Sequence, residues 1–152
     1  MVDILLHIGI TMLAFVSMEG VAWLSHKYIM HGFLWHLHED HHTRENILTH
    51  FEKNDFFFLL FATPGITLIL FGVNELSWMF FAGLGIALYG LAYFLIHDVF
   101  IHRRLKWLRN SNSAYFRAIR RAHKVHHKHL GKEHGECFGM LWVPIKYFKS
   151  ES

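Results

Sequence analysis

Residues 26–42 have the sequence HKYIMHGFLWHLHEDHH, in which two histidine boxes follow one another: HX4H over residues 26–31 and HX2HH over residues 38–42. The same order recurs later in the chain, with HX4H over residues 97–102 and HX2HH over residues 123–127. The chain is rich in histidine, with 15 in 152 residues, but chance does not arrange them as four boxes in a repeated order. The pattern predicts a site that needs many imidazoles.

The boxes predict a metal site with two ions. Neutral imidazole binds Zn, Cu, Fe or Ni, and ten boxed histidines exceed what one ion accepts. Because residues i, i+3 and i+4 of a helix share a face, each HX2HH box is expected to present three imidazoles to a common point. The second histidine of each HX4H box is expected from the turn or helix that follows a span. With about six ligands per ion, roughly two positions stay open for water or O2, which indicates chemistry rather than a structural role. The predicted ligands are His26, His31, His38, His41, His42, His97, His102, His123, His126 and His127.

Three apolar stretches flank the boxes: residues 4–24, 56–73 and 78–96, which are 21, 18 and 19 residues long. At about 1.5 Å per residue, a helix over each stretch covers roughly the 30 Å hydrocarbon core of a bilayer. The short polar turn at residues 74–77 predicts a tight hairpin of the second and third helices. The sequence therefore predicts an all-α integral membrane protein with three transmembrane helices and a helical cap that carries the histidines at one membrane face.

Basic residues predict the orientation of these spans. Lysine and arginine are absent from residues 1–3 and 74–77, whereas three lie between the first two spans and twelve follow the third. The positive-inside rule then places the histidines and the C-terminus in the cytoplasm and the N-terminus outside an inner membrane. A single cysteine, Cys137, fits this placement. The first apolar run is expected to be a retained span rather than a signal peptide, and residues 1–152 are expected to form one membrane-embedded domain.

Two segments after the third span have distinct expectations. Ser111–Ser113 is expected to cap a helix that runs to about Lys128 along the membrane surface, with its histidines and its basic residues on separate faces. Anionic lipid is the simplest partner for the basic face and an acidic electron donor is an alternative, whereas nucleic acid is not expected. Residues 138–148 are apolar but short and contain Pro144, so a lid or a short fourth membrane-embedded segment is expected.

Residues outside the ligand set are expected to support it. Metal-bound imidazoles usually donate their second N–H to a carboxylate or carbonyl, and Asp98 is predicted for this role beside His97. Glu19 lies inside the first span, where charge is costly, two turns before His26. It is predicted to support the metal site or a proton path. For His50 and His134 the sequence leaves ligand, supporting and surface roles open.

Two further patterns concern packing and access. Gly83, Ala87 and Gly90 form a small-residue stripe in the third span, which predicts close helix packing. Aromatic residues at the span ends either line a lateral entrance for a lipid-soluble substrate or form an interfacial belt. These residues are Trp23, Phe33, Trp35, Phe94 and Phe100.

The chain resembles the bacterial non-haem carotenoid β-ring hydroxylases, a family within the fatty acid hydroxylase and sterol desaturase superfamily. The resemblance covers nearly the whole chain and is carried by residues 26–42, by YGLAYFLIHDVFIHRRL (89–105), by RRAHKVHH (120–127) and by CFGMLWVP (137–144). It implies that the ten boxed histidines bind two iron ions and that O2 is the co-substrate. It also implies that reduced ferredoxin or a similar protein donates electrons, and that β-carotene is hydroxylated at carbon 3 of each ring, through β-cryptoxanthin to zeaxanthin. Family members differ at His134, which is therefore not among the predicted ligands.

Three alternatives remain beside this resemblance. A fatty acyl chain or a sterol would keep the chemistry and change the substrate. A membrane metal-binding or transport protein is disfavoured, because Glu75 is the only carboxylate between residues 56 and 96. A haem-binding electron carrier would need histidines that face each other within the spans, whereas 14 of the 15 lie toward one membrane face.

Overall fold

The computed structural model describes residues 2–43, 51–108 and 110–149, and within these ranges the chain is helical with no β-strand. The elements in chain order are α1 (Val2–Ser25), η1 (His26–Phe33), α2 (Trp35–Thr43), α3 (Asp55–Gly72), α4 (Trp78–Phe94), η2 (Leu95–Ile101), α5 (Ala114–Lys128) and η3 (Ile145–Phe148). His50 lies outside the described residues, so its role stays open.

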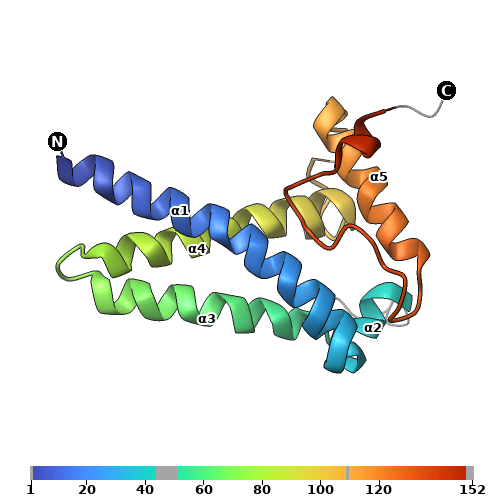
Figure 1. Ribbon diagram of the computed structural model, residues 1–152, viewed down its shortest axis with the longest axis horizontal. Coiled ribbons are helices and arrows are strands. Elements are labelled where there is room, and N and C mark those ends of the chain that lie inside the picture. Colours follow the sequence, from blue (N-terminus) through green and yellow to red (C-terminus); the bar gives the residue numbers. More distant parts are fainter. Residues whose placement is uncertain (1, 44–50, 109, 150–152) are drawn as a thin grey trace.

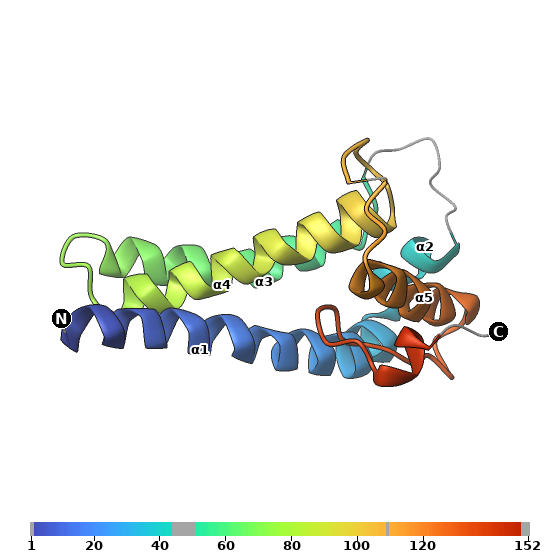
Figure 2. The ribbon, with the colours of Figure 1, turned by 90° about the horizontal axis from the view of Figure 1, so that it is seen from above.

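Three helical runs are long and apolar enough to cross a membrane: Asp3–Phe33, Asp55–Gly72 and Trp78–Ile101. Their outer faces carry exposed apolar side chains such as Leu13 and Leu70, which suit contact with lipid rather than water. The N-terminus and the α3–α4 turn lie at one end of the bundle, and α2 and α5 lie at the opposite end (Figures 1 and 2). The prediction of three spans with a helical cap at one end is confirmed.

The spans are held together by close packing on α4, against which α1 and α3 both pack. A Cβ atom on Gly83 would lie 2.6 Å from the carbonyl oxygen of Gly65 in α3. One on Gly85 would lie 2.4 Å from the carbonyl oxygen of Thr11 in α1. A Cβ atom on Gly90, by contrast, would have nothing within 4 Å. The predicted packing stripe is therefore correct at Gly83 and wrong at Gly90, where α4 faces open space.

Each HX4H box lies where a span continues as a π-helix: η1 continues α1, and η2 continues α4. In an α-helix, five residues make about 1.4 turns, so two histidines at this spacing would point in different directions. A π-helix joins residues i and i+5 by a hydrogen bond, as between the His102 N–H and the His97 carbonyl at 2.9 Å, and stacks them on one face. Both histidines of the first box therefore come from η1, not from a span and a following turn or helix as we expected. In the second box, His97 lies in η2 and His102 is the residue that follows this helix, as expected.

The cap is completed by α5 and the segment after it. Ser113 caps α5 as predicted, because its Oγ accepts a hydrogen bond from the Phe116 N–H at 3.3 Å, and the helix ends at Lys128. Residues 129–142, which we call the C-terminal strap, then run back from α5 to the histidine end of α1 (Figure 1). Beyond the strap, η3 packs through Tyr147 against α5. In the described residues this C-terminal part is a covering segment and contains no fourth spanning helix.

Candidate metal centre

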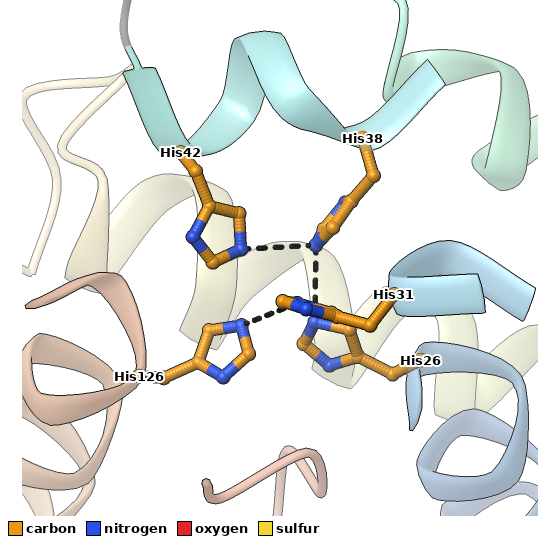
Figure 3. Close-up of side chains that lie close together, drawn as sticks. All are labelled: His26, His31, His38, His42 and His126. Atoms are coloured by element: carbon orange, nitrogen blue, oxygen red, sulfur yellow. Dashed lines mark hydrogen bonds between the residues drawn. The ribbon is translucent and has the colours of Figure 1, made fainter. Parts of the chain in front are cut away.

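Five histidines converge at the capped end of the bundle, and we call them the first histidine cluster. They are His26 and His31 from η1, His38 and His42 from α2, and His126 from α5. One ring nitrogen of each lies within 4.8 Å of those of the other four, and all five residues are buried. Figure 3 shows the rings directed toward a common centre from three separate elements.

Hydrogen bonds at the Nδ1 atoms fix which nitrogen of each ring faces the centre. The acceptors are backbone carbonyls for four rings, at 2.9–3.1 Å, and the side-chain oxygen of Asn54 for His38, at 2.6 Å. Because a carbonyl oxygen only accepts, each Nδ1 carries the proton and a neutral ring has its lone pair on Nε2. Three Nε2–Nε2 pairs nevertheless lie only 3.1–3.3 Å apart. Lone pairs this close repel one another unless a cation lies between them.

A transition-metal ion fits this arrangement of donors. Two imidazole nitrogens bound to one ion at about 2.1 Å, at a right angle to each other, lie about 3.0 Å apart. The Nε2 separations of 3.1–3.3 Å in the first cluster are close to this value. Five nitrogens around one ion leave one position of an octahedron for another ligand.

A second histidine cluster lies beside the first and consists of His41, His97, His102 and His123. The Nε2 atoms of His102 and His123 are 2.8 Å apart, close to the separation of two nitrogens bound to one ion. Here carboxylates support the rings: Glu52 accepts from the His41 Nδ1 at 2.8 Å and Asp98 from the His97 Nδ1 at 3.2 Å. Asp98 thus makes the contact that was predicted for it.

Arg104 joins the supporting carboxylates. Its guanidinium nitrogens lie 2.8 Å from Glu52, 2.9 Å from Asp55 and 3.3 Å from Asp98. Sequence reasoning missed Glu52 and Arg104, because neither lies in a box and a lone charged residue in a loop is usually a solvated one. Asp98 and Arg104 are six residues apart in the chain, but no sequence spacing relates Glu52 to the ring that it supports.

The HX2HH boxes divide between the two clusters, which corrects the expectation that each box serves one point. At about 100° per residue, the outer histidines of a box are about 40° apart on the helix, while the middle one is about 100° from the last. His38 and His42 accordingly serve the first cluster, and the middle histidine of their box, His41, crosses to the second. In α5 the middle histidine, His126, crosses to the first.

His127 lies beside the second cluster without meeting the same distance limit as its members. Its ring centroid is 4.4 Å from that of His123 and 4.7 Å from that of His41, and the ring also stacks on His42 of the first cluster with centroids 4.5 Å apart. Its Nε2 is buried and has no hydrogen-bond partner among the described residues. His127 also lies four residues after His123 on the same face of α5, just as His42 lies four residues after His38 on the same face of α2. His127 is therefore the tenth histidine of the centre by position.

Burial keeps these imidazoles neutral. Burial, followed by the nearby His31, lowers the pKa of His42 to about 4. Burial, followed by the nearby His42, lowers the pKa of His126 to about 3 and that of His127 to about 2. At neutral pH these rings therefore offer lone pairs rather than positive charge, and the neutral ring is the form that binds metal ions.

An apolar cavity of about 300 Å³ lies among the three spans and reaches both clusters. His26 of the first cluster and His97 of the second both line it. From there the cavity extends to Ile66 and Ile86, near the middle of α3 and α4. Gly90 also lines it, which accounts for the open space on that side of α4.

The cavity is lined by aromatic residues other than the five for which the sequence left a lateral entrance or an interfacial belt open. The aromatic lining residues are Phe57, Phe58, Phe61, Tyr89, Tyr93 and Phe138. Trp23 and Phe33 face outward, as residues of an interfacial belt do, and Phe100 is buried against Phe116 with ring centroids 4.5 Å apart. Sequence reasoning missed the lining residues because, in a span that is apolar all round, cavity-facing and lipid-facing positions have the same composition.

His134 lies outside both clusters. It is exposed, and its φ of 65° is in the left-handed region, where it turns the strap. Of the histidines outside the boxes, His7 stacks on Phe81 with ring centroids 4.0 Å apart and His36 is exposed. The structure therefore brings together nine of the ten predicted ligands in two sets, with the tenth, His127, beside the second.

The structure is that of an integral-membrane protein with a candidate metal centre at one membrane face. It has three spans, two histidine clusters that can each hold a metal ion, and an apolar cavity that reaches both clusters. The chain belongs to the fatty acid hydroxylase family, whose profile matches residues 11–144. This confirms the superfamily that the histidine boxes indicated.

Similar proteins narrow the comparison further. A β-carotene hydroxylase of Pseudescherichia vulneris is 39% identical over 138 residues, covering 88% of this chain and 75% of the relative. A β-carotene hydroxylase of Pantoea ananas is 38% identical and covers 85% of this chain and 73% of the relative. The chloroplastic β-carotene hydroxylase 1 of Capsicum annuum is 38% identical over 86% of this chain but only 42% of its own length. No solved structure matches this chain.

Proposed function

We propose that this protein is a non-haem di-iron monooxygenase that hydroxylates carbon 3 of carotenoid β-ionone rings, taking β-carotene through β-cryptoxanthin to zeaxanthin with O2 as co-substrate. The observation that carries the proposal is the apolar cavity between the spans, which ends at one histidine from each cluster. A lipid-soluble substrate held there has its end beside both candidate metal positions. The names of the bacterial relatives support a carotenoid as that substrate.

Ten histidines would hold the two ions: the nine in the two clusters and His127. Iron is proposed rather than zinc because hydroxylation with O2 needs electron transfer at the metal, and zinc has no redox chemistry. When bound, iron would supply the chemistry by which O2, two electrons and two protons turn a C–H bond into C–OH and release one water. Asp98 and Glu52 would fix the orientation of His97 and His41 and increase the basicity of these rings.

The cavity would bind one end of the carotenoid. Its volume of about 300 Å³ is at the lower end of the range for ligand sites, so one ring enters while the polyene extends away between the spans. Walls formed by Phe57, Phe61 and Ile66 would hold the ring by apolar contact and exclude water from the reacting carbon. Because the two rings of β-carotene are identical, each would enter in turn, with β-cryptoxanthin formed before zeaxanthin.

The proposed placement is the inner membrane, with the histidine clusters and the C-terminus in the cytoplasm and the N-terminus outside. The clusters lie at the end of the bundle opposite the N-terminus (Figure 1). All 15 lysine and arginine residues lie outside the N-terminal segment 1–3 and the 74–77 turn, which would face the other side. A cytoplasmic metal centre would be accessible to a soluble electron donor.

The basic surface of α5 is the proposed docking site for a reduced, acidic electron-transfer protein such as a ferredoxin. An open depression on the cap is lined by His42 and His127, and Lys124 and Lys128 line the same depression. Arg117, Arg120 and Arg121 form a second depression with Lys124 on α5. A donor at this surface would approach both clusters from the side away from the apolar cavity, and opposite charge would speed its encounter.

Reversing one charge at this surface should weaken donor binding. We expect Lys124→Glu to raise the KM for a reduced [2Fe–2S] ferredoxin at low salt by about tenfold, and high salt should shrink the difference by screening. Steady-state assays of the purified protein at two ionic strengths measure this. Lys106→Glu makes the same charge change at an exposed residue outside α5 and should have little effect. An equal rise of the KM for ferredoxin in both variants would mean that the basic surface of α5 is not the docking site.

Product analysis tests the proposed function directly. Expression in cells that accumulate β-carotene should give β-cryptoxanthin and zeaxanthin, identified by chromatography and mass spectrometry. Unchanged β-carotene beside well-expressed, iron-loaded protein would reject the carotenoid as substrate. Hydroxylated fatty acids or sterols in the same extract would then identify the other substrate class of the family.

A further inference from the structure

The C-terminal strap supports the first histidine cluster almost alone. Its backbone carbonyls at positions 129, 132, 136 and 138 accept hydrogen bonds from the Nδ1 atoms of four of the five rings. The pairs are His129 O with His42 at 3.1 Å, Lys132 O with His31 at 3.0 Å, Glu136 O with His126 at 2.9 Å and Phe138 O with His26 at 3.0 Å. Any shift of the strap therefore turns four imidazoles together.

No such hydrogen bond from the strap is found in the second cluster among the described residues. The rings of His41 and His97 are held by Glu52 and Asp98, which Arg104 joins. The hydrogen bonds that orient His41 and His97 thus come from a different part of the chain than those of the first cluster, even though the two clusters lie side by side.

One carboxylate inside the membrane-spanning bundle fixes the end of the strap. Glu19 in α1 accepts hydrogen bonds from three consecutive backbone N–H groups, those of Met140 and Trp142 at 2.9 Å and that of Leu141 at 2.9 and 3.0 Å. The hydroxyl of Tyr89 in α4 donates a further bond at 2.8 Å. All of these partners donate hydrogen bonds, and an ionised carboxylate can only accept them.

The contact between Glu19 and the strap is also sterically tight. A Cβ atom on Gly139 would lie 2.9 Å from the Oε1 of Glu19, so glycine permits the close approach. Phe138, whose carbonyl holds His26, is the next residue toward the cluster. The Glu19 carboxylate therefore fixes the strap directly beside the point where it supports the first metal position.

We propose that Glu19 is a positioning residue for the first metal position alone. It holds the strap against α1 and α4, the strap holds four imidazoles, and loss of this anchor loosens one metal position while the other stays bound. This inference rests on the proposed function only in requiring two metal positions. It concerns metal binding, which is measured without turnover.

Metal content of the purified full-length protein in detergent tests the inference. Each variant is loaded with Fe(II) without oxygen, dialysed against a weak chelator and analysed by plasma mass spectrometry. We expect two ions per chain in the wild type and about one in Glu19→Gln, which keeps the side-chain size but replaces one accepting oxygen by a donor. Arg104→Gln is the matched control and should lose the second ion instead.

Double variants identify the position that is lost. Glu19→Gln combined with His31→Ala should still hold about one ion, because both changes act on the first position. Glu19→Gln combined with His97→Ala should hold none. Two retained ions in Glu19→Gln, or none in the combination with His31→Ala, would overturn the inference while leaving the proposed function intact. A wild type without metal would overturn both.

Gly139→Ala gives an independent test that leaves Glu19 in place. The added methyl group would lie 2.9 Å from the Glu19 Oε1, so the carboxylate or the strap must shift and the hydrogen bonds between them weaken, which should also lower the metal content toward one ion. Size-exclusion chromatography and circular dichroism identify variants that do not fold. If Glu19→Gln is among them, Gly139→Ala decides: two tightly held ions in this variant would reject the positioning role.

Discussion

His126→Ala should produce no detectable hydroxylated carotenoid in cells that accumulate β-carotene. His126 is completely buried, its Nδ1 donates to the Glu136 carbonyl and its Nε2 lies 3.3 Å from that of His31. The substitution removes one proposed ligand and leaves the carbonyl without its donor. Changing a residue that merely supports a metal ligand typically lowers metal affinity or activity by about 10–100-fold. Loss of the ligand itself should therefore lower activity by more than about 100-fold.

His134→Gly is the matched control for this prediction. It also removes a histidine from the cap, but His134 is exposed and lies outside both clusters. Its left-handed φ of 65° suits glycine, so the variant should fold at least as well as the wild type. Immunoblots of the membrane fraction compare protein amounts. Zeaxanthin from His126→Ala at more than about a hundredth of the wild-type level would argue against a ligand role.

The histidine boxes and the apolar runs make the general plan of this protein predictable. Apolar runs of bilayer length predict spans, and a box of histidines at i, i+3 and i+4 predicts a helix that presents them. The π-helical ends were not predicted, although the HX4H spacing is consistent with them in retrospect. A spacing of five matches the i→i+5 hydrogen bond, but the pattern alone does not distinguish a π-helix from an α-helix followed by a turn.

The supports of the two clusters could not be predicted from the sequence in the same way. Backbone carbonyls hold four rings of the first cluster, and every residue has a carbonyl, so the strap has no side-chain signature. Glu19 could be singled out because a carboxylate in a span is unusual, but its partners in the strap are N–H groups more than 120 residues away. Such contacts depend on how the strap folds back, which no local pattern describes.

Gly90→Leu should strongly reduce β-carotene hydroxylation while leaving the fold and the metal content intact. Gly90 lines the apolar cavity, and a Cβ atom there meets nothing within 4 Å. A leucine side chain therefore extends into the cavity without a clash with the backbone. In an apolar pocket, one methylene group more or less changes the ratio of kcat/KM between two substrates by about 10–200-fold. Four carbon atoms added to the pocket wall should therefore lower the conversion of β-carotene by at least about tenfold.

The expected effects on stability and activity have opposite signs, which makes this variant informative. Leucine is favoured over glycine in a helix by about 0.5–1 kcal/mol, so the thermal stability of Gly90→Leu should not fall. Gly9→Leu in α1 gives the same gain at an exposed position outside the cavity and should keep full activity. Pigment analysis, metal content and thermal unfolding in detergent are measured for both. Full activity of Gly90→Leu would mean that the ring reaches the metal centre by another route, whereas loss of activity in both variants would indicate a general effect of leucine in these spans.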